Sequence, residues 1–541
     1  MKKFAIILAF VLCFSLLVGC KKKGGGEENP GFGEERPVQS NDAMFSDRDL
    51  DFTYRDETAI QVVLKGDTAE ASDKSVQING SVVTLTLEAT YIISGNLDNG
   101  MLVVDMTKNE KPQLVFKGVD IHCDSSAPLY VKQADKVFVT LVEGTENSLS
   151  TGSSFEAIDK NKIDGAVFAK DDLTINGKGS LTVDCPAGHG IVCKNDLVLA
   201  GGSYDITAIG HALSGEDSVR VTQSKVTANI GKDAVHAKSD EAGDLGFVYI
   251  ADGEFSLKAG GDGISATSSV QINAGSFTIT TGGGVAAAPT TDLNALDAVS
   301  CKGIKADKNI IIKGGEATVD SCDDAINANG NVTISGGTYT LSTGDDAVTS
   351  DASVAVSGGT VKVLTCAEGF EAPEISISGG DVTLAVTKNA LNAMGTGAGS
   401  HGRIDISGGS VSIYCDGDCL DTDGVIKLTG GNLVLTSSVN GGATALNWGT
   451  EGIINGGTLF AFDPSIVGKP FTSGEQGYLV VNTSKMEQGT AVTVKNSSGG
   501  TVASVTAPHG FSSIVISHAD ITSGQTYQVI VGSTTVNATA E

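Results

Sequence analysis

Acidic residues recur at one place in the sequence, just before a small residue and an apolar one. The doublets Asp323-Asp324 and Asp345-Asp346 are each followed by Ala and a β-branched residue, and Glu368 is followed by Gly and Phe. In stacked strands these carboxylates would lie about 5 Å apart, where two charges repel by roughly 3 kcal/mol at an effective dielectric near 20. Calcium offsets such repulsion, because it takes six to eight oxygen ligands and can bridge neighbouring carboxylates. The pattern therefore predicts a row of calcium ligands.

Further acidic residues follow or approximate the same pattern, and we include them in the predicted metal row. The candidate ligands are Asp262, Asp323, Asp324, Asp345, Asp346, Glu368, Asp416, Asp418, Asp421 and Asp423. For a single doublet the alternative is a solvated turn aspartate held by its own local hydrogen bonds. Recurrence in consecutive copies favours metal. The stretch 416–424 lacks the spacing and the final Glu of an EF-hand loop.

These acidic positions lie in a repeat of about 22 residues. Gly-Gly pairs at 314–315, 336–337, 358–359 and 379–380 are spaced by 22, 22 and 21 residues. Apolar and polar residues alternate between them, which predicts short strands with one buried face. A unit of this length with glycine corners is one coil of a β-solenoid. We therefore predict an all-β fold, a right-handed parallel β-helix; β-sandwich and β-propeller are the competing architectures, and a propeller blade needs about 40–50 residues.

The two ends of the chain differ from the repeat. Residues 1–19 have the charge and the short apolar run of a signal peptide, and Leu17-Val18-Gly19-Cys20 is similar to a lipobox, which predicts lipid attachment at Cys20. An ordinary secreted protein is the alternative. We expect a flexible tether at 20–45, the β-helix at 46–468 and a small C-terminal β-domain at 469–541 that covers the open end.

The charge of the chain argues against nucleic acid and anionic lipid as partners. The formal net charge is −28, so the surface repels nucleic acid and anionic lipid. The eight cysteines after Cys20 form no CxxC pair, which argues against a tetrahedral zinc site. Disulfides and buried thiols fit these cysteines equally well.

Several motifs in order resemble one known family. They are Gly144-Thr145-Glu146-Asn147, Ala169-Lys170-Asp171-Asp172-Leu173, Lys302-Gly303-Ile304-Lys305-Ala306, Asp323-Asp324-Ala325-Ile326, Gly344-Asp345-Asp346-Ala347, Glu368-Gly369-Phe370-Glu371 and Asp416-Gly417-Asp418. Over about residues 50–541 the chain resembles the bacterial carbohydrate-binding domain-containing family of secreted β-helix proteins. The resemblance implies calcium sites and binding of cellulose and polygalacturonate. His189 and His211 stand where this family has Asp, and Lys388-Asn389 where an acidic doublet is usual.

The lipobox-like motif predicts a lipoprotein at the cell surface, and the resemblance implies that it binds polysaccharide with Ca²⁺ as its cofactor. Bridging ions would let a strongly acidic protein hold an acidic polymer. We take Lys302, Lys305, Phe370 and Trp448 as candidate carbohydrate contacts. The expected partners are polysaccharide and, through the lipid anchor alone, the membrane; we expect an exported monomer and no nucleic acid.

Two alternative functions stay open. A calcium-dependent polysaccharide lyase would use calcium to acidify the proton beside a uronate carboxylate, and a nearby Lys as the base. Lys302, Lys305 and Lys308 are the candidates, although balancing the acidic edge is the role we favour for them, and we predict no catalytic residue. The other alternative is a structural surface adhesin in which calcium serves rigidity.

Overall fold

The computed structural model describes residues 44–541, apart from 242, 289–298, 398, 439–441 and 466–469. The predicted signal peptide, the lipid-attachment residue Cys20 and most of the predicted tether lie outside the described residues. Nearly every element is a β-strand, and most strands pair in parallel with the equivalent strand of the next coil. Within the described residues, no helix is long and apolar enough to cross a membrane.

Each regular coil contributes one strand to each of three sides, and the first side is a 16-stranded sheet. Its strands are β3 (Val76–Asn79), β4 (Val82–Leu85), β6 (Met101–Asp105), β8 (Leu129–Gln133), β11 (Gly165–Ala169), β13 (His189–Cys193), β15 (Leu213–Gly215), β18 (Val235–Ala237), β21 (Ile264–Ala266), β24 (Ile304–Ala306), β27 (Ile326–Ala328), β30 (Val348–Ser350), β33 (Phe370–Glu371), β36 (Leu391–Ala393), β39 (Leu420–Thr422) and β41 (Leu446–Trp448). We call this sheet the first side.

The second and third sides belong to one 28-stranded sheet that folds at a corner. The second side has β9 (Lys136–Leu141), β16 (Ser218–Thr222), β19 (Phe247–Ile250), β22 (Val270–Ile272), β25 (Ile310–Ile312), β28 (Val332–Ile334), β31 (Ser353–Val356), β34 (Glu374–Ile377) and β37 (Arg403–Ile406). The third side has β10 (Glu146–Thr151), β17 (Ser224–Ile230), β20 (Gly253–Ala259), β23 (Ser276–Thr281), β26 (Glu316–Ser321), β29 (Thr338–Thr343), β32 (Thr360–Thr365), β35 (Asp381–Val386) and β38 (Ser410–Cys415). Six strands run through both sides: β5 (Thr90–Leu97), β7 (Gln113–Cys123), β12 (Asp172–Cys185), β14 (Asp196–Ala208), β40 (Val425–Ser437) and β42 (Glu451–Asp463).

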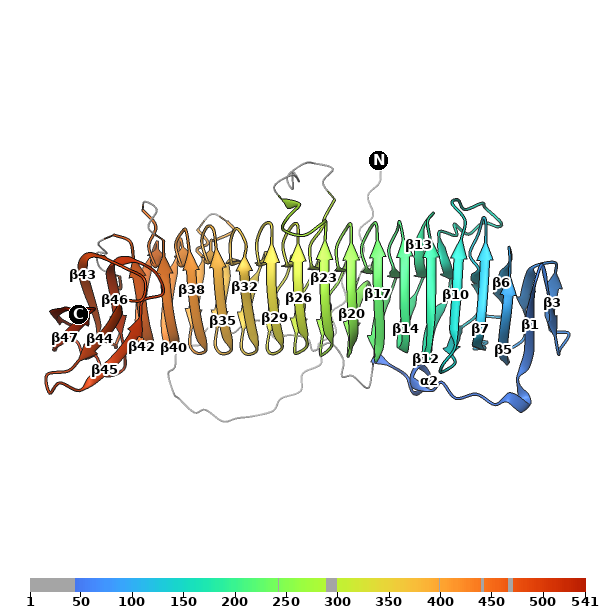
Figure 1. Cartoon of the computed structure of the whole chain (residues 1–541), viewed down its shortest axis with the longest axis horizontal. Coiled ribbons are helices and arrows are strands. Elements are labelled where there is room, and N and C mark those ends of the chain that lie inside the picture. Colours follow the sequence, from blue (N-terminus) through green and yellow to red (C-terminus); the bar gives the residue numbers. More distant parts are fainter. Residues whose placement is uncertain (1–43, 242, 289–298, 398, 439–441, 466–469) are drawn as a thin grey trace, which may run out of the picture. The chain divides into compact units, whose positions relative to one another are not determined.

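Glycine makes the corner between the second and third sides, as the repeat predicts. Gly315 and Gly337 both have φ of 88°, a left-handed conformation that disfavours other residues. A Cβ added to Gly337 would lie 2.7 Å from the carbonyl oxygen of Gly315 in the preceding coil. Each corner therefore needs glycine both for the turn and for the close approach of the next coil. Figure 1 shows the equivalent strands β17, β20, β23, β26 and β29 lying side by side.

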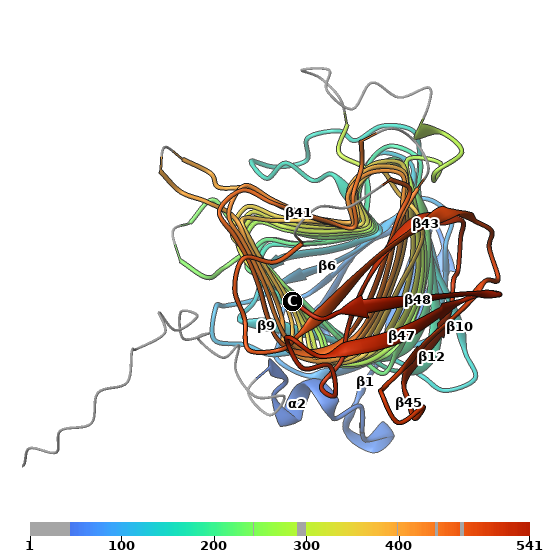
Figure 2. The same cartoon turned by 90° about the vertical axis from the view of Figure 1, so that its left-hand side faces the viewer.

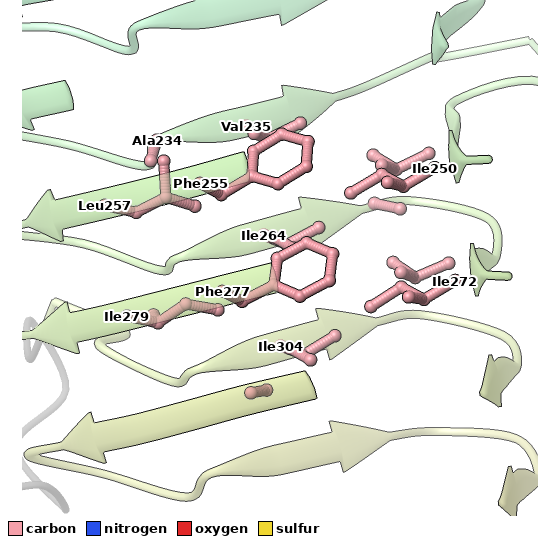
Figure 3. Close-up of a cluster of buried hydrophobic side chains, with 14 of the residues drawn as sticks. Ala234, Val235, Ile250, Phe255, Leu257, Ile264, Ile272, Phe277, Ile279 and Ile304 are labelled. Atoms are coloured by element: carbon pink, nitrogen blue, oxygen red, sulfur yellow. The ribbon is translucent and has the colours of Figure 1, made fainter. Parts of the chain in front are cut away.

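The interior of the coils is a continuous apolar core. Strands such as β20 and β26 alternate buried and outward residues, and the buried residues stack on their equivalents in the next coil. Phe255 and Phe277 illustrate this stacking, with ring centroids 4.8 Å apart and nearly parallel planes (Figure 3). All eight cysteines from Cys123 to Cys419 are buried free thiols. The alternative of disulfides is therefore not the one found in the structure.

Both ends of the solenoid are closed by other elements. At the N-terminal end lie the antiparallel partners β1 (Ile60–Gly66) and β2 (Thr68–Ala71). They are preceded by η1 (Asp56–Thr58) and by α2 (Asp47–Leu50), whose Asp49 accepts a hydrogen bond from Thr174 on the side of the coils. At the other end β46 (Phe511–Ser517) pairs antiparallel with β42 and with β43 (Tyr478–Met486). A four-stranded sheet follows, made of β45 (Thr501–Thr506), β44 (Ala491–Lys495), β47 (Thr526–Val531) and β48 (Thr534–Thr539). β46 thus pairs with the last strand of the 28-stranded sheet, β42. In Figure 2, β47 and β48 lie across the C-terminal end of the coils.

Candidate cation-binding face

Two rows of polar residues run along the first side, one rung per coil. The inner row lies immediately before each buried strand and is followed by Ala, Gly or Cys and then by a buried apolar residue. Its members are His189, His211, Asp233, Asp262, Lys302, Asp324, Asp346, Glu368, Asn389, Asp418 and Thr444. The outer row lies three residues later, at the outward position of each strand. Its members are His236, Ser265, Lys305, Asn327, Thr349, Glu371, Asn392, Asp421 and Asn447, whose backbones pair from coil to coil.

The side chains of the inner row hydrogen-bond to the next coil, and this explains which residue types occur there. At most steps the side chain accepts a hydrogen bond from the backbone N–H of the next rung. Asp324 Oδ1 accepts from Asp346 N at 3.1 Å, and Asp346 Oδ1 accepts from Glu368 N at 2.9 Å. The imidazole Nδ1 of His189 and the amide oxygen of Asn389 serve in the same way for the next coils. Asp, Glu, Asn and neutral His all offer an acceptor at this distance, so the row tolerates the substitutions noted in the sequence.

In the middle of the first side, a lysine side chain neutralises neighbouring carboxylates. Lys302 occupies an inner-row position, and its Nζ lies 2.9 Å from Asp323 Oδ1 and 2.7 Å from Asp324 Oδ2. Burial alone would lower the pKa of Lys302, but the two carboxylates outweigh it and raise that pKa. Lys305, in the outer row, lies 3.7 Å from Asp262. We call Asp262, Lys302, Lys305, Asp323 and Asp324 the lysine-paired segment.

The next coils carry acidic residues without such a cation. Asp345, Asp346, Glu368 and Glu371, which we call the acidic segment, are all partly buried. Among the described residues, no Lys, Arg or His nitrogen lies within ion-pair distance (4.0 Å) of them. Burial, reinforced by Asp324 and Asp345, raises the pKa of Asp346 to about 8. Burial also raises the pKa of Glu368.

Oxygen atoms without hydrogen bonds lie beside the acidic segment. Thr349 and Asn392 flank Glu371 in the outer row. In the described part of the chain, the buried atoms Thr349 Oγ1 and Asn392 Oδ1 have no hydrogen-bond partner. Carboxylate, amide and hydroxyl oxygens are the donors that calcium prefers. Oxygen donors of the kind that calcium prefers therefore lie beside Asp346, Glu368 and Glu371. Asp345 also lies close to the neighbouring segment, because one carboxylate oxygen from each of Asp323, Asp324 and Asp345 lies within 4.8 Å of the other two.

Two of the last predicted ligands, Asp418 and Asp421, accept hydrogen bonds from asparagine side chains. Asn447 Nδ2 donates to both Asp418 and Asp421, at 2.9 Å each, and Asn389 Nδ2 donates to Asp421 at 2.7 Å. Burial, followed by Asp418, raises the pKa of Asp421 to about 6. Amide donors thus do here part of what Lys302 does in the lysine-paired segment.

Three of the sequence predictions need correction. Asp423 does not belong to the row: it lies beyond the far end of β39, where its Oδ1 accepts hydrogen bonds from the backbone N–H groups of Gly395 and Gly402. Asp416 is exposed and precedes the inner-row position by two residues. Phe370 is fully buried, so it cannot stack on a sugar; the period-2 pattern of β33 turns it into the core.

Trp448 is partly buried against the core, and its indole N–H donates to the carbonyl oxygen of Pro470 at 2.9 Å. Lys302 balances the acidic edge, which is the role that the sequence favours for it. Glu371 is absent from the predicted ligands, although it belongs to the motif Glu368-Gly369-Phe370-Glu371. Aligning every coil on a polar residue, a small residue, an apolar residue and a second polar residue, whatever the charge, would find it.

Comparisons with known proteins place the chain in a family. A model of the carbohydrate-binding domain-containing protein family matches residues 79–347 and 346–540. A carbohydrate-binding domain-containing protein of Acetivibrio thermocellus is 31% identical over 226 residues, which are 41% of this chain and 79% of that protein. A solved polysaccharide lyase-like protein from C. thermocellum, a gadolinium derivative, has 31% identity and a TM-score of 0.41, covering 42% of this chain and 92% of its own. The chain therefore belongs to the carbohydrate-binding domain-containing protein family.

Proposed function

We propose that this protein binds polysaccharide through calcium held by the acidic segment of the first side. The observation that carries the proposal is the stack of partly buried carboxylates in which the pKa of Asp346 is raised to about 8. Stacked anions with this much repulsion are stabilised by a cation. Family membership supports carbohydrate as the ligand class.

Asp345, Asp346, Glu368 and Glu371 are the residues that would hold the ion. Calcium accepts six to eight oxygen ligands in flexible arrangements, so it would keep positions open for an oxygen from the ligand. A bound ion would thus offer positive charge to the carboxylate of an acidic sugar at a face that is otherwise negative. An acidic polymer such as polygalacturonate is accordingly the preferred ligand, and cellulose is the neutral comparison.

The surroundings of Lys302 favour a binding protein over a lyase. A general base works best with a pKa near the working pH, whereas the two carboxylates raise the pKa of Lys302. Its ammonium group already contacts both Asp323 and Asp324. Lys305 has a side chain that is 30% exposed, and we assign it a direct contact with the sugar chain.

We also propose that the protein is exported and anchored by lipid at Cys20. The support is the lipobox-like Leu17-Val18-Gly19-Cys20. Mass spectrometry of the protein isolated from membranes should find a lipid-modified Cys20 as the first residue. A Cys20→Ser variant should instead leave the membrane fraction, and an unmodified, unprocessed N-terminus in the native protein would contradict the anchor.

Binding to polygalacturonate and cellulose, with calcium and with chelator, tests the function. We expect polygalacturonate binding that is lost in chelator and in the double variant Asp345→Asn/Asp346→Asn. The exposed Asp416→Asn is the matched control and should bind like the wild type. Ultraviolet absorbance is followed at the same time, because a rise would reveal unsaturated product and lyase activity. Equal binding in chelator and in calcium would contradict the proposal.

A further inference from the structure

Three histidines are stacked at the N-terminal part of the two rows. His189 and His211 occupy consecutive inner-row rungs, and His236 lies in the outer row one coil further. The ring centroids of His189 and His211 are 4.9 Å apart, and those of His211 and His236 are 4.0 Å apart, with planes within 13° of parallel. The coils place two of these imidazoles, those of His211 and His236, next to the carboxylate of Asp233.

The nitrogens of two of these rings face the same carboxylate oxygen. Asp233 Oδ2 lies 2.7 Å from His236 Nδ1 and 3.4 Å from His211 Nδ1. One ligand atom from each of the three residues lies within 4.8 Å of the other two. Ligand atoms about 2.1 Å from a tetrahedral zinc ion are about 3.4 Å from one another. The three atoms are therefore near the separations that one such ion would impose. The rings of His211 and His236 are nearly parallel, so binding one ion requires them to turn until both Nδ1 lone pairs, which lie in the ring planes, point at it.

The side chains are held and shielded in a way that suits ligation. Asp233 Oδ1 accepts the backbone N–H of Asp262 at 2.8 Å, which leaves Oδ2 directed at the imidazoles. The side chains of His211, Asp233 and His236 are only 13%, 14% and 17% exposed. His236 Nδ1 is buried and makes no well-directed hydrogen bond within the described residues, despite its short distance to Asp233.

We propose that His211, Asp233 and His236 form a site for a divalent transition-metal ion such as Zn²⁺, distinct from the acidic segment. Two imidazoles and one carboxylate suit ions of this class, whereas calcium prefers an all-oxygen shell. The ion would replace the hydrogen bond that His211 Nδ1 accepts from Asp233 N at 3.1 Å. A fourth position would be filled by water.

His189 is a positioning residue for this site. Its Nδ1 accepts the backbone N–H of His211 at 2.9 Å, and its ring stacks on that of His211. Because the proposed ligands come from two coils, a bound ion would join those coils. We therefore expect metal binding to raise the melting temperature as well as to give a stoichiometric binding signal.

The test is a titration of the chelator-treated protein with Zn²⁺ in excess Ca²⁺, by calorimetry and thermal unfolding, and with Co²⁺ by visible absorption. We expect one Zn²⁺ per chain, a higher melting temperature and the absorption bands of tetrahedral Co²⁺. Both His211→Gln and His236→Gln should abolish the Co²⁺ bands and weaken Zn²⁺ more than His189→Gln, for which about a tenfold loss is expected. His122→Gln, which removes an exposed His–Asp pair, and Asp346→Asn should keep the site.

Two outcomes would overturn this assignment. One is Zn²⁺ binding that is unchanged in the folded double variant His211→Gln/His236→Gln, with folding checked by circular dichroism. The other is the lack of any stoichiometric Zn²⁺ binding by the wild-type protein. Both are independent of the calcium proposal, because Asp346→Asn removes the calcium effect while leaving the histidines in place.

Discussion

The lysine-paired segment and the acidic segment are neighbouring parts of the same two rows and differ mainly in charge. In the first, Lys302 occupies a rung and contacts Asp323 and Asp324 at less than 3 Å. In the second, the equivalent rungs are Asp346 and Glu368, and no cation of the described residues is within ion-pair distance of either. The same backbone accommodates both kinds of residue. At most steps an inner-row side chain needs only to fit and to accept a hydrogen bond from the backbone N–H of the next coil. The charge of an inner-row residue can therefore differ from coil to coil. That charge decides whether the coil needs a bound metal ion to neutralise it.

Substitution of Lys302 should lower the free energy of unfolding more than the other changes below. It leaves the lysine-paired segment without its cation, as in the acidic segment. The side chains of Lys302 and Asp324 are 18% and 7% exposed, and breaking a buried pair by removing one partner costs about 3–5 kcal/mol. We expect Lys302→Met to lower the melting temperature markedly in chelator and to become strongly stabilised by calcium.

Lys305→Met is the matched control for this change. Its single ion pair is 3.7 Å long with a side chain that is 30% exposed, so the expected loss is under about 1 kcal/mol. Equal losses in the two variants would show that Lys302 does not neutralise its segment in the way we describe.

Asp346→Asn makes the opposite change in the acidic segment. Asparagine keeps the oxygen that accepts the N–H of Glu368 and removes the charge that Asp324 and Asp345 oppose. In chelator the variant should melt at a temperature equal to or above that of the wild type, and calcium should stabilise it less. A variant that melts lower in chelator yet gains fully from calcium would contradict the role of Asp346.

The pH dependence of stability tests the charge of Asp346 without any mutation. The pKa of Asp346 is about 8 in the folded protein against 3.8 ordinarily, so the folded state binds more protons than the unfolded chain between these values. The stability that this group contributes is present below about pH 4 and is lost as pH rises through about 8. Thermal unfolding in chelator should show this decline, and calcium should reduce it. A calcium gain that is constant from pH 5 to pH 8 would exclude the coupling.

The smallest expected effect concerns the amide-supported pair Asp418 and Asp421. Asn447 is exposed and donates to both carboxylates, so Asn447→Ala should cost about 1 kcal/mol. The loss should raise the pKa of Asp421 beyond about 6, which nuclear magnetic resonance titration of the carboxyl group can follow. An unchanged Asp421 pKa would show that Asn447 does not stabilise its charge.

The sequence predicts the fold well because glycine corners such as Gly315 and Gly337 and the alternation between them leave few other arrangements. The acidic rungs at Asp324, Asp346 and Glu368 follow from the same register. The burial of Phe370 could not be predicted, because the sequence does not show which way a two-residue strand faces. The position of Asp423 outside the row depends on where β39 ends, which the sequence does not show either. The charge-balancing role of Lys302 could be predicted from its place one coil before the Asp323-Asp324 doublet. Its position within the inner row could not be predicted by a search for acidic doublets, because the alignment of the coils is a property of the stacked structure.

A crystal structure of the protein grown with calcium and a short oligogalacturonide tests the central claim most directly. The account predicts calcium bound by Asp345, Asp346, Glu368 and Glu371, with a carboxylate oxygen of the sugar completing its shell. Sugar bound elsewhere, or calcium absent from these carboxylates while they contact water alone, would contradict it.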